Sequence, residues 1–145
     1  MIRKIEAKDK SAFLEMNHTF YHSEAVLHTI PEKNAADTFS LILNGSPYAD
    51  AYMLEEDGEI CGYVLLALTH SNEAGGLVVW IEEIYIKDNF RGRGLGGRCI
   101  EFLKQCYPKA VRFRLEVSDS NEAVKRLYAR HGFSALSYQQ MVLDR

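Results

Sequence analysis

Apolar residues in the first 45 positions predict one short strand followed by two helices. Residues 2–6 are typical of a strand, and residues 8–21 form an amphipathic helical pattern. The apolar face of this helix comprises Phe13, Met16, Asn17 and Phe20. A second helix is expected from Pro31 to about Gly45, because proline suits a first helical turn and glycine commonly follows the last. The irregular segment 22–30 between the helices holds His22 and His28, and two interpretations are open: it lines a pocket, or it is a surface loop.

From residue 51 the pattern changes to strands. Residues 51–56 and 60–69 are rich in β-forming side chains and are separated by a short turn that contains Gly58, which predicts a meander. A polar loop then leads to residues 77–86. Since apolar residues occupy both the odd-numbered and the even-numbered positions of residues 77–86, we expect this strand to be buried on both faces of a sheet.

The second half alternates helices and strands. A helix is expected over residues 93–107 and an alternating, half-buried strand over 111–117. A further helix should begin near Asn121 and end at Gly132, and residues 133–143 are predicted to form a last strand. Nothing resembling a linker or repeat separates these parts. We therefore predict a single α/β domain over residues 1–145.

Length and composition narrow the possible classes. At 145 residues with 47% apolar residues, the chain is long enough for one substantial core and short for two. It has no run of about 18 apolar residues and no secretory signal at its start, so we expect a cytoplasmic protein without a membrane span. Its three cysteines show no C-x-x-C pair and no histidine at ligand spacing, which predicts neither a disulfide framework nor a metal site.

The net charge of −3 combines two segments of opposite sign. Residues 1–86 carry 5 Lys or Arg and 14 Asp or Glu, whereas residues 87–131 carry 11 and 5. A basic segment beside glycines suits a polyanionic small molecule, and an acidic remainder can attract a cationic substrate such as an amine. We do not expect nucleic acid as a partner, because the basic stretch is short and the whole chain is acidic.

A glycine-rich turn joins the strand at 77–86 to the helix that follows. It consists of Arg91, Gly92, Arg93, Gly94, Leu95, Gly96 and Gly97. Glycines let a phosphate approach free backbone N–H groups, and the helix N-terminus and the arginines add positive charge. The spacing also satisfies the dinucleotide pattern G-x-G-x-x-G, but about 90 residues precede the turn and about 50 follow it, which disfavours that fold. A P-loop is excluded because no Gly-Lys-Ser or Gly-Lys-Thr ends the turn.

Three pieces in this order resemble the GNAT superfamily of N-acetyltransferases. They are Ile84-Tyr85-Ile86 with the glycine turn, the strand Phe113 to Val117, and Asn121 through Tyr128 to Gly132-Phe133. The resemblance covers about residues 77–133. It implies a mixed, mostly antiparallel central sheet flanked by about four helices, with two splayed strands that hold acetyl-CoA as cosubstrate.

The resemblance also implies roles for particular residues. The coenzyme-binding set is Ile84, Tyr85, Ile86, Arg91, Gly92, Arg93, Gly94, Leu95, Gly96, Gly97 and Asn121. Tyr128 is the expected general acid, since a phenol of pKa about 10 can protonate a departing thiolate. Packing in the core is the competing interpretation of Tyr128, and capping a helix is that of Asn121. Either Glu82 or Glu83 is the expected base, and the sequence does not separate them because a bulge would shift the alternation.

The acceptor remains open at this stage. We expect its pocket to include Phe20, Tyr21, His22, Tyr48 and Trp80, and its chemistry to be that of a small-molecule or peptide amine. The acidic first half favours a small cationic molecule. A homodimer is possible by analogy with the family. The alternative function is a non-catalytic acyl-CoA-binding regulatory module with the same fold.

Overall fold

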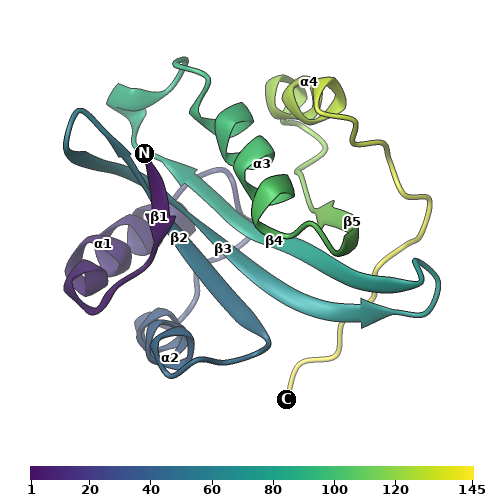
Figure 1. The fold of residues 1–145 in the computed structure, drawn as a ribbon, viewed down its shortest axis with the longest axis horizontal. Helices are drawn as coiled ribbons and strands as arrows, with labels where there is room; N and C mark the ends of the chain where they lie inside the picture. The colour runs from purple at the N-terminus through teal and green to yellow at the C-terminus, as the bar shows by residue number, and fades with distance from the viewer.

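The protein is built on one five-stranded sheet. A computed structural model describes residues 1–145 and places the strands in the order β1-β2-β3-β4-β5 (Figure 1). The strands are β1 (Ile2–Lys4), β2 (Ala49–Glu56), β3 (Glu59–Ser71), β4 (Gly76–Ile86) and β5 (Ala110–Leu115). The first four pair antiparallel, and β5 alone runs parallel to its neighbour β4. This mixed, mostly antiparallel sheet confirms the predicted fold class.

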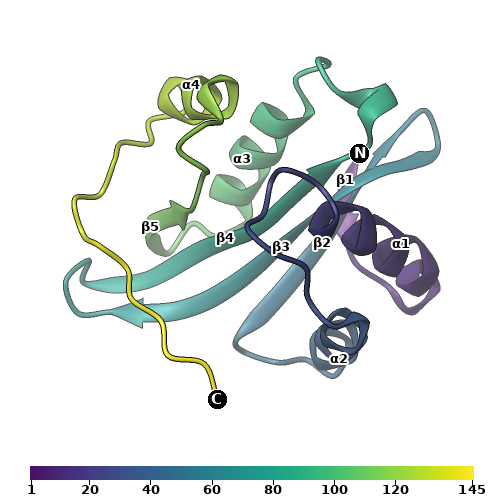
Figure 2. The ribbon, with the colours of Figure 1, turned by 180° about the vertical axis from the view of Figure 1, so that it is seen from behind.

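Two pairs of helices cover the two faces of the sheet. They are α1 (Lys10–Tyr21), α2 (Glu32–Leu43), α3 (Leu95–Cys106) and α4 (Glu122–Arg130), with short 3-10 turns at Ala7–Asp9 and Asp88–Phe90. Figures 1 and 2 show α3 and α4 on one side and α1 and α2 on the other. The predicted helices are therefore confirmed, with ends that differ by a few residues. None of them is both long and apolar enough to cross a membrane.

Each face of the sheet carries its own core. On the α3 side, buried residues such as Leu54, Val79 and Leu103 form one cluster. On the α1 and α2 side, Phe13 and Tyr63 are fully buried within a second cluster. Strand β4 contributes to both clusters and is buried on two faces, as its continuous apolar run predicts. Strand β3 contributes to both clusters as well.

The predicted last strand is wrong. Residues 133–145 form no helix or strand and run as an irregular chain past β5 and across the α1 and α2 side (Figure 2). Gln140 Nε2 donates a side-chain hydrogen bond to Glu116 Oε1, just after β5, at 2.7 Å. Apolar side chains such as Met141 and Leu143 are exposed. Alternating apolar residues favour a strand only where a neighbouring strand accepts their backbone hydrogen bonds, and this segment has none.

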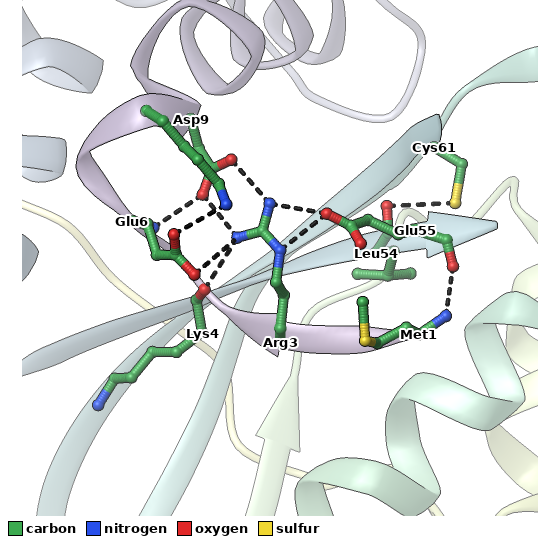
Figure 3. A network of polar contacts seen from close by, with 9 residues as sticks. Met1, Arg3, Lys4, Glu6, Asp9, Leu54, Glu55 and Cys61 are labelled. Carbon is green, nitrogen blue, oxygen red and sulfur yellow. Dashed lines mark hydrogen bonds and ion pairs between the residues drawn. The ribbon is translucent and has the colours of Figure 1, made fainter. Parts of the chain in front are cut away.

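An arginine fastens β1 to the rest of the protein. The Arg3 guanidinium donates two hydrogen bonds to the Asp9 carboxylate, at 2.8 and 2.9 Å, and one to Glu55 at 2.7 Å (Figure 3). The Met1 ammonium donates to the Glu55 carbonyl nearby. Asp9 is 1% exposed, and its hydrogen bonds with Arg3 hold its pKa below the ordinary value. A bidentate ion pair thus adds to the backbone pairing that holds this three-residue strand against β2.

We expect Asp9→Asn to lower the free energy of unfolding at pH 7 by about 2 kcal/mol, because it leaves part of the Arg3 guanidinium unpaired. Since the folded-state pKa of Asp9 is depressed, its contribution is present at neutral pH and is lost as the pH falls below the ordinary 3.8 towards the folded value. The difference between the two proteins should shrink over that range in urea unfolding. Asp37→Asn, which removes an exposed partner of Lys33, is the control. Equal losses in the two variants would contradict this role.

Candidate functional site

The main cleft of the protein opens where β4 and β5 part. Their parallel pairing ends at Ile81 and Leu115, although β4 continues to Ile86. The β5-facing edge of residues 82–86 therefore has no neighbouring strand. A cleft of about 1170 Å³ lies along this edge. Its walls are the end of β4, the glycine turn with the start of α3, residues 115–130, and residues 19–25, which comprise the end of α1 and the segment that follows it.

A β-bulge in β4 fixes the two acids of this edge. Leu65 of β3 pairs with Glu83, and the next residue, Leu66, pairs with Ile81, so Glu82 is the extra residue. Ile81 and Ile84 both pack on the α3-side core. The two acids between them consequently lie away from that core, although they are adjacent in sequence.

The surroundings of the two acids differ sharply. Glu82 is exposed to the cleft, whereas Glu83 is 6% exposed. Partial burial in the cleft walls raises the pKa of Glu82, and the negative charges of Glu83 and Glu116 raise it further. Burial also raises the pKa of Glu83, but hydrogen bonds from neighbouring side chains oppose that change.

Glu83 accepts hydrogen bonds from three side chains. Tyr21 Oη lies 2.6 Å from Oε1, while Tyr63 Oη and Asn17 Nδ2 lie 2.7 and 2.8 Å from Oε2. Asn17 Nδ2 also lies 3.1 Å from Tyr63 Oη. Helix α1 is thereby bonded to strands β3 and β4 through one buried carboxylate.

The glycine turn presents backbone N–H groups to the cleft. Gly92 and Gly94 adopt φ of 76° and 75°, a left-handed conformation that favours glycine. Helix α3 begins directly after Gly94, and no side chain caps it. Because the first N–H groups of a helix have no partner within it, those of residues 95–97 remain free to bind an anion such as a phosphate.

Two glycines of the turn also permit close helix packing. A Cβ at Gly96 would lie 3.1 Å from Leu127 Cδ2, and one at Gly97 would lie 2.7 Å from His131 Nε2. Both neighbours belong to α4 or to its C-terminal cap. The absence of side chains here therefore lets α4 pack closely against the start of α3, and both helices line the cleft.

The two arginines of the turn are placed differently. Arg91 lines the cleft, and its Nε donates to the Ile86 carbonyl at 3.0 Å. Arg93 does not line the cleft. Its guanidinium lies 4.9 Å from the centre of the Phe90 ring and donates to the Asn89 carbonyl.

Tyr128 and Asn121 face the cleft from the opposite wall. Burial raises the pKa of Tyr128 to about 12, so its hydroxyl keeps its proton at neutral pH. The Tyr128 ring also packs against Phe133, with 5.6 Å between ring centres. Asn121 is the N-cap of α4, where its Oδ1 accepts from the Val124 N–H at 3.3 Å. The capping role of Asn121 is thus present in the structure, and so is its place beside the cleft.

The predicted pocket residues separate into two groups. Phe20 and His22 line the cleft. Tyr21 instead borders a smaller cavity of about 260 Å³ between α1 and α2, which His22 also lines. Tyr48 is exposed and outside both cavities, and Trp80 lies under the Arg114 guanidinium at 4.1 Å from its ring centre.

Three residues near the acids were not among the predicted site residues. Glu116 and Glu24 line the cleft, and Asn17 holds Glu83. Asn17 carried a signal, because it is a polar residue on the apolar face of its helix. Glu116 follows the end of β5, and Glu24 follows the end of α1. The sequence has no periodic pattern that predicts the path of the chain at these two places.

Comparison with known proteins agrees with this geometry. Residues 12–133 match the family described as the acetyltransferase (GNAT) family. An uncharacterized N-acetyltransferase of Lactobacillus delbrueckii subsp. lactis is 33% identical over 103 residues, which are 68% of this chain and 59% of that protein. The chain thus spans less than two thirds of that relative. A second relative, from Bacillus subtilis (strain 168), bears a name that marks it provisionally as a ribosomal protein bS18-alanine N-acetyltransferase. It is 30% identical over 89% of this chain and 82% of its own length.

Solved structures show the same fold. A possible acetyltransferase from Clostridium difficile 630 superposes with a TM-score of 0.83 at 15% identity, covering 100% of this chain and 97% of that one. The aminoglycoside N-acetyltransferase AAC(6')-Iy in complex with CoA gives 0.81 at 16% identity, covering 100% and 94%. Since the family match covers most of the chain and the fold agrees, the protein belongs to the acetyltransferase (GNAT) family.

Proposed function

We propose that the protein transfers the acetyl group of acetyl-CoA to a primary amine, with the cleft between β4 and β5 as its active site. The observation that carries this proposal is the content of the cleft, which combines a glycine turn able to hold phosphate with a carboxylate, Glu82, and a phenol, Tyr128. Membership of an acetyltransferase family supports the choice of donor.

The donor would lie along the open edge of β4. Its pyrophosphate suits the free N–H groups at the start of α3, beside Arg91. Its pantetheine arm would occupy the gap between the strands and bond the backbone at Ile84 and Ile86, as an added strand would. The cleft-facing position of Asn121 fits a further contact with this arm.

The reaction needs a proton acceptor and a proton donor. The amine nitrogen attacks the thioester carbonyl carbon, the C–S bond breaks, and an amide forms. Glu82 takes the proton that the amine loses, and the Tyr128 hydroxyl gives its proton to the departing thiolate. A backbone N–H of the β4 edge would stabilise the oxyanion formed in between.

The charge of the cleft favours a cationic acceptor. Glu24, Glu82 and Glu116 line the cleft and reach it from three different segments. Opposed acidic side chains lower the energy of a bound ammonium group and raise its local concentration. We therefore propose an acceptor with more than one amino group, of which one is acetylated and another stays charged.

Binding of the donor is the first test. Isothermal titration with acetyl-CoA should give a dissociation constant well below 1 mM. A constant of 1 mM corresponds to a binding free energy of about −4 kcal/mol. Gly94→Ala should weaken this binding, because a left-handed conformation costs a side-chain-bearing residue about 1–2 kcal/mol and disturbs the turn. Gly45→Ala, at a left-handed glycine after α2, is the control that shares the strain but not the site. Absence of measurable binding to the unaltered protein would refute the proposal.

Tyr128→Phe should reduce kcat by at least about tenfold while the affinity for acetyl-CoA changes little, since the ring is kept and only the proton donor is removed. A continuous assay of thiol release measures the first quantity, and titration measures the second. Tyr138→Phe, which alters an exposed tyrosine outside the cleft, serves as control. Full turnover by the Tyr128→Phe variant would remove Tyr128 from the mechanism.

Glu82→Gln should lower kcat/KM by about a hundredfold at neutral pH, because the amide cannot accept the amine proton. In the unaltered protein, the rate should fall on the acid side of a pKa above the ordinary value of 4.5, since the base acts only when ionised. Glu59→Gln, at the exposed start of β3, is the matched control. Retained activity together with an unchanged pH profile would exclude Glu82 as the base.

A further inference from the structure

Glu83 is the most enclosed carboxylate near the cleft. Its two oxygens accept three hydrogen bonds, of 2.6, 2.7 and 2.8 Å, from side chains of α1 and β3. These hydrogen bonds favour the ionised carboxylate and oppose the burial that raises the pKa of Glu83. They also leave the carboxylate little room to approach a substrate amine. Its geometry suits a fixed negative charge better than a proton carrier.

Glu83 is connected to two parts of the cleft wall, the bulge of β4 and the segment after α1. Through its own backbone Glu83 adjoins Glu82, the bulged residue of β4. Through Tyr21 it holds the last residue of α1, after which His22, Ser23 and Glu24 line the cleft. One buried carboxylate therefore positions the bulge and the segment that faces it.

We propose that Glu83 is a positioning residue. Its carboxylate is held by Asn17, Tyr21 and Tyr63 and orients Glu82 and the segment after α1. It also supplies a fixed negative charge beside the reacting amine. This inference rests on the proposed acetyl transfer with Glu82 as the base. It assigns different roles to two adjacent acids that the sequence could not separate.

The negative charge of Glu83 has a directed effect on its neighbour. Burial in the cleft walls is the largest cause of the raised pKa of Glu82. The negative charges of Glu83 and Glu116 raise this pKa further. Removing the Glu83 charge must therefore lower the pKa of Glu82 and extend activity to lower pH. The other titratable or charged groups that line the same cleft are His22, Glu24, Tyr85, Asp88, Arg91, Tyr128 and Arg130.

Glu83→Gln tests the inference, because it keeps the shape of the side chain and removes its charge. We expect the acid limb of kcat/KM to move to lower pH by about half a unit or more, the size of a Coulomb interaction between neighbouring carboxylates in a partly buried site. We also expect kcat at the optimum to fall severalfold and the KM for acetyl-CoA to stay within twofold. Glu73→Gln, which removes an exposed acid paired with Arg112, should leave the limb in place.

The outcomes separate this inference from the proposed function. If Glu82→Gln is inactive and the acid limb of Glu83→Gln does not move, the inference is overturned and the proposed function stands. If Glu83→Gln is inactive at every pH while Glu82→Gln keeps the activity, Glu83 is the base, and both role assignments fail. Absence of acetyl transfer by the unaltered protein overturns the proposed function itself.

A second variant decides the matter if Glu83→Gln does not fold, as judged by thermal unfolding. Tyr21→Phe keeps the Glu83 charge but removes the bond that holds the end of α1. It should raise the KM for the acceptor at least threefold without changing the KM for acetyl-CoA, and the equally conservative Tyr138→Phe, at an exposed position outside the cleft, should change neither. An unchanged acceptor KM in Tyr21→Phe would overturn the inference.

Discussion

The separation of β4 from β5 is the feature on which the rest of the site depends. Pairing stops after Ile81 and Leu115, and the remaining residues of β4 keep one edge free of any strand. An unpaired edge inside a protein is costly unless water or a ligand satisfies its polar groups. In this family member the cleft lies along that edge, so the cost of the open strand is offset when a ligand is bound.

The bulge at Glu82 adds a second constraint at the same place. Residues three positions apart in a regular strand point to opposite faces. The bulge shifts this alternation, so that Ile81 and Ile84 pack on the same core. An unbroken strand would send one of Glu82 and Glu83 into that apolar core. With the bulge, Glu82 lies in the cleft, and Glu83 accepts hydrogen bonds from Asn17, Tyr21 and Tyr63. A local irregularity thus produces two environments from two identical side chains.

Sequence reasoning recovered what depends on local patterns. The four helices, the five strands and the glycine turn follow from periodicity and from the positions of glycine and proline. The roles of Glu82 and Glu83 could not be separated, because their facing depends on a register shift against Leu65 and Leu66. The strand predicted over 133–143 failed for a related reason, since alternation indicates a strand only where a partner edge exists. Tyr48 and Trp80 were expected in the acceptor pocket, but in the structure neither lines the cleft or the smaller cavity.

Asn121 shows how one side chain can serve the fold and a ligand together. Its carbonyl oxygen is occupied by the Val124 N–H at the start of α4. The amide nitrogen of the same side chain is a donor with two hydrogens, and capping does not consume it. Aspartate would cap the helix equally well but would offer only acceptors, and serine would offer a single shorter hydroxyl. At this position, asparagine is the cap that still leaves a neutral donor for a carbonyl group lying in the cleft.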